Sequence, residues 1–164
     1  MSLKFHIRKA HKKDLEAVIA LERSTSNAPH WTESDYNTAV EGDPHSALRR
    51  CLFVAEQENG DQRLRLLGFA VGKSIGTGVE GTAELESVVV AEQARRSGVG
   101  RALCATVVQW CSELKIPNVA LEVRASNIGV IAFYTDLGFA SFGLRKRYYR
   151  DPEDDAVIMQ ITVF

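Results

Sequence analysis

The chain has 164 residues, of which 45% are apolar and 25% are charged, and its formal net charge is −1. This size and composition suit one globular domain over residues 1–164. The near-zero charge argues against a general attraction to nucleic acid or to a membrane surface. The three cysteines show no metal-ligand spacing, and we see neither a signal peptide nor a membrane-spanning run. We therefore expect a reduced, cytoplasmic protein without a metal site.

The N-terminal half is expected to contain one strand, two helices and then three strands. Hydrophobic periodicity places the strands at 5–10, 51–57, 64–75 and 83–91, and the helices at 12–23 and from Thr32 onward. Thr32 is followed three positions later by Asp35, which is a capping-box pattern for the start of a helix. The segments NGD (59–61) and GTGVEG (76–81) have the composition of turns.

The C-terminal half alternates between helices and strands. A long amphipathic helix is expected after residue 98 and ends before Pro117, followed by a strand at 118–123 that is apolar on both faces and therefore central. Ser126 or Asn127 would cap a last helix, which Gly138 ends. Two closing strands are expected at 139–149 and 156–164, joined by the acidic turn DPEDD. The resulting order, β-α-α-β-β-β-α-β-α-β-β, predicts a mixed α/β sheet.

The stretch RRSGVGR (95–101) lies where a strand gives way to the long helix. A helix N-terminus offers unpaired N–H groups, and glycines and arginines favour a bound anion, so the stretch suits a phosphate. A tight turn with solvated arginines is the equally simple alternative. The Walker pattern is absent. The dinucleotide pattern is incomplete because Leu103 stands where its third glycine would be.

The segment 95–100 matches the phosphate-loop pattern [Q/R]-x-x-G-x-[G/A], and the chain resembles the GNAT superfamily of acetyl-CoA-dependent N-acetyltransferases. The order of elements is also that of the superfamily. Four further segments are similar to its RimI-like branch, the alanine N-acetyltransferases of a ribosomal protein. They are APHWTESDY (28–36), LEVRASN (121–127), AFYTDLGF (132–139) and RKRYYRDPEDDAVIM (145–159). The resemblance implies the acyl-CoA N-acyltransferase fold, with a mostly antiparallel central sheet flanked by helices.

The resemblance also implies roles for individual residues. The backbone of Val88, Val89 and Val90 would line the acetyl group and the pantetheine arm of acetyl-CoA. Asn127 would hydrogen-bond that arm. The pyrophosphate would be held by the glycine turn, which consists of Arg95, Arg96, Ser97, Gly98, Val99, Gly100 and Arg101.

Glu122 and Tyr134 match the proton acceptor and the proton donor of the branch. A carboxylate can take the proton of an amine directly or through water. A phenol, with a pKa of about 10, can protonate a departing thiolate. Each residue also has a simpler, non-catalytic interpretation. Glu122 could form an ion pair with Arg124, and the ring of Tyr134 could be packed in the core. Glu84 is a rival base, because other branches use an acidic residue on its strand.

The acceptor is expected to be the N-terminal α-amine of a protein or peptide, foremost the alanine of a ribosomal protein. At pH 7.5 roughly a third of α-amines are already neutral, against about a thousandth of lysines, so one carboxylate suffices for an α-amine. Trp31 and Tyr148 would border the peptide. The basic RKRYYR (145–150) could bind nucleic acid, but the neutral total charge and the acidic turn after it argue against this. The alternatives are an enzyme that acetylates a lysine side chain or a small amine, and a non-catalytic sensor of acyl-CoA. We expect the protein to be a monomer or a weak homodimer.

Overall fold

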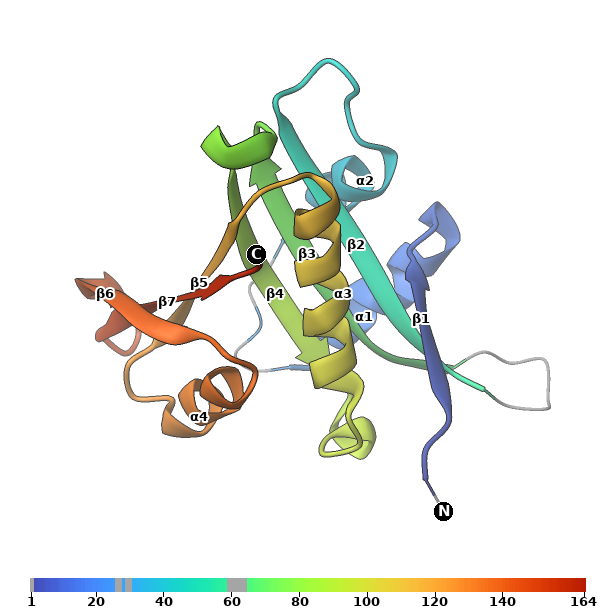
Figure 1. The fold of residues 1–164 in the computed structure, drawn as a ribbon. Helices are drawn as coiled ribbons and strands as arrows, with labels where there is room; N and C mark the ends of the chain where they lie inside the picture. Colours follow the sequence, from blue (N-terminus) through green and yellow to red (C-terminus); the bar gives the residue numbers. More distant parts are fainter. Residues whose placement is uncertain (1, 26–27, 29–30, 59–64) are drawn as a thin grey trace.

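A computed structural model describes residues 2–25, 28, 31–58 and 65–164 of the chain (Figure 1). Its seven strands are β1 (Phe5–Lys9), β2 (Leu48–Gln57), β3 (Arg65–Ile75), β4 (Thr82–Val90), β5 (Asn118–Arg124), β6 (Ala140–Tyr149) and β7 (Asp154–Thr162). The four α-helices are α1 (Leu15–Arg23), α2 (Glu33–Glu41), α3 (Val99–Glu113) and α4 (Ile128–Asp136). The order of these elements is the one that the sequence predicts.

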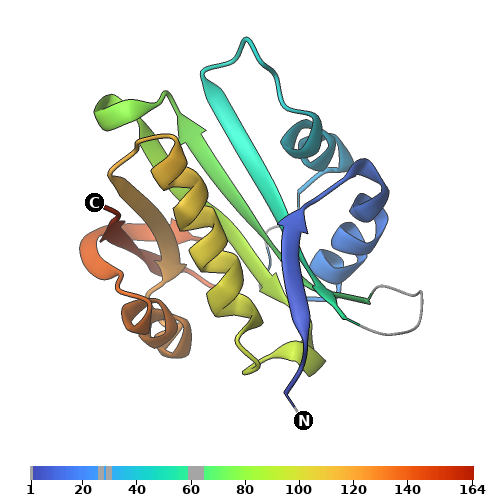
Figure 2. The same ribbon diagram turned by 45° about the vertical axis from the view of Figure 1, so that its right-hand side comes forward.

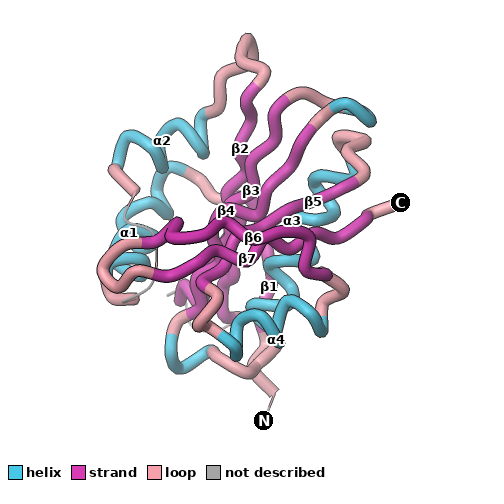
Figure 3. The backbone as a smooth tube through the Cα atoms, turned by 90° about the vertical axis from the view of Figure 1, so that its left-hand side faces the viewer, coloured by secondary structure: helices cyan, strands magenta, loops and turns pink. Residues whose placement is uncertain are grey.

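The strands form one sheet in the order β1-β2-β3-β4-β5-β7-β6. Neighbouring strands are antiparallel except β4 and β5, which are parallel. Helices cover both faces of this sheet: α3 crosses one face, and α1 and α2 lie on the other (Figures 2 and 3). The mixed, mostly antiparallel sheet is therefore confirmed, and β5 occupies the central position expected of a strand that is apolar on both faces.

Each face of the sheet has its own apolar core. Under α3 the core includes Leu103, Val107 and Cys111, which are fully buried on the side of the helix that packs against β2, β3 and β4. Under α1 and α2 it includes Val18 and Phe69. The three free cysteines are buried, and burial raises the pKa of each thiol to about 12. Among the described helices, none combines the length and the apolar character needed to span a bilayer.

Local sequence signals place the helix ends. Thr32 and Asp35 form the predicted capping box at the start of α2: the Thr32 hydroxyl accepts the Asp35 N–H at 3.2 Å, and Asp35 accepts the Thr32 N–H at 3.0 Å. Asn127 rather than Ser126 caps α4, because its Oδ1 accepts the Val130 N–H at 3.3 Å. Gly138 follows α4 with a φ of +101°, a left-handed conformation that glycine adopts without strain.

The structure corrects some element boundaries. Strand β2 begins at Leu48, three residues before the predicted start, because these residues pair with the end of β3. Strand β7 begins at Asp154, so the last two residues of the acidic turn DPEDD belong to the strand. The predicted turn at 59–61 lies outside the described residues.

A buried carboxylate fixes the position of α2. Glu22 of α1 is fully buried and accepts a hydrogen bond from the hydroxyl of Tyr36, which is 1% exposed. The Trp31 N–H also donates to Glu22, at 3.3 Å. Buried polar groups need such partners because leaving them unpaired costs more than the bond contributes. The periodicity of the first helix shows Glu22 on its inner side, but only the tertiary structure shows why a charge is tolerated there.

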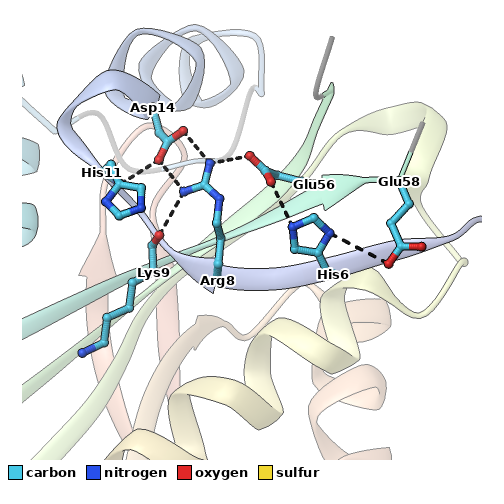
Figure 4. A network of polar contacts seen from close by, with 7 residues as sticks. All are labelled: His6, Arg8, Lys9, His11, Asp14, Glu56 and Glu58. Atoms are coloured by element: carbon cyan, nitrogen blue, oxygen red, sulfur yellow. Dashed lines mark hydrogen bonds and ion pairs between the residues drawn. The ribbon is translucent and has the colours of Figure 1, made fainter. Parts of the chain in front are cut away.

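A polar network ties β1 to the turn before α1 and to β2 (Figure 4). The guanidinium of Arg8 binds both oxygens of Asp14, at 2.7 and 2.8 Å, and also Glu56. The other Glu56 oxygen lies 3.0 Å from Nε2 of His6. The hydrogen bonds from Arg8 lower the pKa of Asp14 and of Glu56. Because the side chains of Arg8, Asp14 and Glu56 are only 23%, 14% and 7% exposed, this network is shielded from solvent and should contribute to stability.

We predict that Arg8→Met lowers the free energy of unfolding by about 2–3 kcal/mol at pH 7, since it leaves two shielded carboxylates without their cation. Carboxylates with lowered pKa values stabilise the fold above about pH 4, and this contribution is lost as the pH falls. The difference in the free energy of unfolding between Arg8→Met and the parent should therefore decrease as the pH falls from 5 to 2. Urea unfolding followed by circular dichroism measures this free energy at each pH.

Lys12→Met is the matched control. Lys12 pairs with Glu41 at 3.3 Å, but the two side chains are 73% and 59% exposed, so its removal should cost less than about 0.5 kcal/mol. An equal effect of the two substitutions would show that the Arg8 network is no more stabilising than a surface ion pair.

Candidate active site between β4 and β5

Strands β4 and β5 separate almost as soon as they pair. Their parallel ladder joins only Ala83 to Val119 and Glu84 to Ala120. Strand β4 also carries a bulge: Val71 faces Ser87 and Gly72 faces Leu85, which leaves Glu86 as an extra residue. Beyond this point β4 keeps β3 as its partner but has lost β5, so one edge of β4 is open in the middle of the sheet (Figure 1).

The open edge of β4 presents backbone groups. The Ala91 N–H donates to Leu67 O of β3 at 2.8 Å. Backbone groups of successive strand residues point to opposite sides, so Val89 is likewise turned toward β3, whereas Val88 and Val90 direct theirs into the gap left by β5. Of the three predicted valines, two therefore turn their backbone groups toward the gap, and one of these groups, Val90 O, accepts a hydrogen bond from Arg95 Nε at 3.5 Å.

The glycine turn lies at the end of the same strand. Gly98 has a φ of +88° and precedes the first residue of α3, and no side chain caps this helix. The Ser97 hydroxyl donates to Ala94 O and tightens the turn. Arg95, Arg96 and Arg101 are exposed around it. The turn thus combines unpaired helix N–H groups with three cations, which is the chemistry that an anion such as a pyrophosphate requires.

Glu122 lies just past the point where β4 and β5 part. It alternates with Leu121 and Val123, which are buried under α3, so its carboxylate points to the opposite face. There it lines a pocket, together with Lys73, Ile75, Thr82, Ala83, Glu84, Ala120, Leu121, Arg145 and Ile158.

The alternative interpretation of Glu122, an ion pair with Arg124, is not what the structure shows. The Arg145 Nε of β6 lies 2.9 Å from Glu122 Oε1. Arg124 instead donates to Pro152 O at 2.9 Å and lies over the ring of Tyr149 at 4.4 Å. A hydrogen bond to Glu122 raises the pKa of the Tyr148 phenol. Glu122 therefore has two partners, both from β6, and sequence spacing could not show either of them.

Glu84 lines the same pocket but is held differently. Lys73 of β3 bridges it and Glu86, with Nζ–O distances of 2.9 and 3.3 Å. Burial lowers the pKa of Lys73, but its contacts with Glu84 and Glu86 outweigh this and the net pKa is raised, so it remains a cation. Arg50 binds the other side of Glu86 at 2.8 Å. Sequence analysis did not identify Lys73 and Arg50, because only the strand register brings them to these carboxylates.

Tyr134 lies on the α3 face, opposite Glu122. Its ring packs edge-on against Phe133 and Phe139, with centroids 5.2 and 5.6 Å away. Burial raises the pKa of its phenol. The core packing considered as the simpler reading is therefore real, and it leaves the proton-donor role untested. Asn127, at the start of the same helix, uses its Oδ1 as a cap, so its amide nitrogen remains the group with which it could bind a ligand.

Trp31 and Tyr148 approach the pocket face from two sides. Trp31 lies under the guanidinium of Arg50, 5.3 Å from its ring centroid, and is thereby linked to Glu86. Tyr148 contacts Glu122 and lies 5.6 Å from the guanidinium of Arg145. Both predicted substrate contacts are thus connected to the charged pocket. Among the described residues, no group of three or more His, Cys, Asp or Glu side chains could hold a metal ion.

The chain belongs to the acetyltransferase (GNAT) family, whose model matches residues 15–139, and it is an N-acetyltransferase of this type. It is 26% identical over 163 residues to a putative ribosomal protein bS18-alanine N-acetyltransferase of Bacillus subtilis, covering 99% of each chain. It is 31% identical to an N-alpha-acetyltransferase of Sulfurisphaera tokodaii, covering 92% of this chain and 89% of that protein. The crystal structure of the ribosomal-protein-S18-alanine N-acetyltransferase of Escherichia coli superimposes with a TM-score of 0.76 at 27% identity, covering 98% and 94%. These comparisons confirm the predicted family and its RimI-like branch.

We predict that Gly98→Ala lowers the free energy of unfolding by about 1 kcal/mol. No atom lies within 4 Å of the added Cβ, so the cost comes only from the left-handed backbone. Gly129→Ala is the control: it adds a Cβ in equally open space within α4, where alanine should stabilise by about 0.5–1 kcal/mol. Thermal and urea unfolding measure the stability change for each variant. If both substitutions change the free energy of unfolding in the same direction, the left-handed backbone of Gly98 does not explain its effect.

Proposed function

We propose that this enzyme transfers the acetyl group of acetyl-CoA to the N-terminal α-amine of a protein, foremost an N-terminal alanine of a ribosomal protein. The observation that carries this is the position of Glu122, whose carboxylate faces a pocket immediately beside the gap between β4 and β5. A donor held in that gap and an amine held in the pocket would meet at the edge of the sheet.

The α3 side of the gap suits acetyl-CoA, which proteins with the GNAT fold bind. The glycine turn from Arg95 to Arg101 would hold the pyrophosphate through helix N–H groups and arginines. The open edge of β4 would pair with the amides of the pantetheine arm in the manner of an added strand. The amide nitrogen of Asn127 would donate to the same arm. The pocket face, with its charged lining, is left to the acceptor.

The chain's own groups meet the three demands of the reaction. Glu122 would take a proton from the acceptor ammonium, directly or through a water, so that the amine can attack the thioester. The N–H of Val88 or Val90 would donate to the carbonyl oxygen as negative charge develops on it. Tyr134 would give its proton to the departing thiolate. Desolvation raises the pKa of this partly buried phenol, so it is in the protonated state that this step needs.

The contacts of the two carboxylates favour Glu122 over Glu84 as the base. Glu84 is bound by Lys73, whose side chain is 24% exposed and also held by Glu86. Glu122 is bound by Arg145, whose side chain is 56% exposed. A solvent-exposed arginine can move away at small cost, whereas Lys73 is held from two sides. The Glu84 side chain is the more exposed of the two, at 35% against 20%, so the preference for Glu122 rests on the ease with which its cation can leave.

The acceptor class rests on chemistry and on the relatives. One partly shielded carboxylate is enough to deprotonate an α-amine with a pKa near 7.7–8.0, and less well suited to a lysine near 10.4. The bacterial relatives are named for the alanine of a ribosomal protein, and the archaeal relative for N-alpha acetylation. Tyr148 and Trp31 would contact the acceptor peptide from opposite sides of the pocket.

The acceptor assignment predicts the outcome of a two-peptide assay followed by mass spectrometry. With acetyl-CoA, a peptide with a free N-terminal alanine and no lysine should gain one acetyl group. A peptide with a blocked N-terminus and one internal lysine should remain unmodified. Acetylation of the second peptide alone would move the acceptor to lysine side chains. Binding of acetyl-CoA with transfer to neither peptide would favour another amine or a sensor.

The assignment of the base predicts that Glu122→Gln lowers kcat by about 10²–10³-fold, because an amide cannot accept the proton. Glu84→Gln is the matched control on the same pocket and should lower kcat by less than about fivefold. Circular dichroism and acetyl-CoA binding verify that both variants are folded. A large loss with Glu84→Gln and a small one with Glu122→Gln would reverse the assignment.

A further inference from the structure

The ion pair on Glu122 joins a shielded carboxylate to an exposed cation. The Glu122 side chain is 20% exposed and that of Arg145 is 56% exposed, with Nε and Oε1 2.9 Å apart. Arg145 belongs to β6, the strand at the edge of the sheet, whose described residues are exposed along nearly its whole length. Its guanidinium therefore reaches the carboxylate from the solvent side, which is also the side from which an acceptor would enter the pocket.

A protonated acceptor amine and Arg145 need the same oxygen atoms. An α-ammonium at neutral pH is a cation with N–H donors, as is a guanidinium, and both seek a carboxylate. A carboxylate already neutralised by arginine attracts a second cation weakly. Tyr148 also donates to Glu122, so Glu122 would keep a hydrogen-bond partner if Arg145 moved away.

We propose that Arg145 is a displaceable counter-ion of Glu122. The guanidinium of Arg145 occupies the place of the acceptor ammonium and must leave when the acceptor binds in its protonated form. The proposal rests on the proposed function, in which Glu122 receives the acceptor amine. Arg145 is thus a positioning and specificity-determining residue: it holds the carboxylate in place between turnovers, and it makes the site harder to enter for protonated amines than for neutral ones.

The other charged groups around Glu122 do not offer the same exchange. Lys73 is engaged by Glu84 and Glu86, and its raised pKa keeps it charged below pH 9. The hydrogen bond to Glu122 raises the pKa of Tyr148, and burial raises that of Tyr149, so neither phenol ionises in this range. Between pH 6.5 and 9, the group that changes its charge is the acceptor α-amine, with a pKa near 7.7–8.0.

The test measures peptide affinity without turnover. Isothermal titration with an alanine-terminated peptide, in the presence of CoA instead of acetyl-CoA, gives the dissociation constant at pH 6.5 and at pH 9. For Arg145→Met we expect binding about two- to fivefold tighter than the parent at pH 6.5, the range that loss of a half-exposed ion pair allows. At pH 9 the amine is mostly neutral and the difference should disappear. Arg145→Lys restores a cation and should return the affinity toward that of the parent.

Arg147→Met is the matched control. Arg147 is on the same strand and is 85% exposed, and its Nε lies 3.2 Å from Glu153 instead of Glu122. This substitution removes one positive charge from β6 and should leave the affinity unchanged at both pH values. An equal gain with Arg147→Met would show a general charge effect and would overturn the proposal.

Two further outcomes would also overturn it. Weaker binding in Arg145→Met would mean that the arginine contacts the acceptor rather than competes with it. Unchanged binding at pH 6.5 would mean that the acceptor does not displace it. Neither outcome depends on the identity of the base, because no acetyl group is transferred. Transfer to neither peptide in the two-peptide assay, by contrast, would refute the proposed function, and full activity of Glu122→Gln would refute only the assignment of the base; both results are distinct from the binding data on Arg145.

Discussion

The early separation of β4 and β5 is the constraint on which the site depends. The two strands pair at only two positions, and the bulge at Glu86 bends β4 at the same level. Because a paired sheet would close the gap with its own hydrogen bonds, the open edge of β4 exists only where β5 has turned away toward β7. The backbone of Val88 and Val90, the glycine turn and Glu122 all take their places from this separation.

The separation of β4 and β5 also places the groups that suit the donor and those that suit the acceptor on opposite faces of the sheet. On the α3 face lie the uncapped helix N-terminus, its arginines and the partly buried phenol of Tyr134, which together suit an anionic thioester donor. On the other face lie carboxylates and cations in close pairs, which suit a charged acceptor. The bulge makes this possible, since it changes which β4 side chains face α3.

Sequence patterns predicted the parts of this arrangement that local chemistry determines. The capping box at Thr32, the glycine at position 98 and the order of elements depend on neighbouring residues, and the structure confirms them. The partner of Glu122 depends instead on the pairing of β6 with β7 and of β7 with β5, including the irregular register after Arg145. No spacing along the chain encodes that pairing, so sequence reasoning could offer only the nearby Arg124 as an alternative partner and could not identify Arg145.

The two sides of the pocket differ in how firmly they are held, and this difference matters for its chemistry. One side is fixed from the core: Glu22 accepts hydrogen bonds from Tyr36 and from the backbone of Trp31, whose ring lies beneath Arg50, which in turn holds Glu86. The other side is β6, exposed and at the edge of the sheet. A rigid side can fix the register of an acceptor chain. An exposed edge strand can release its cation at little cost, so a pocket built this way orients the peptide with one side and admits its amine past the other.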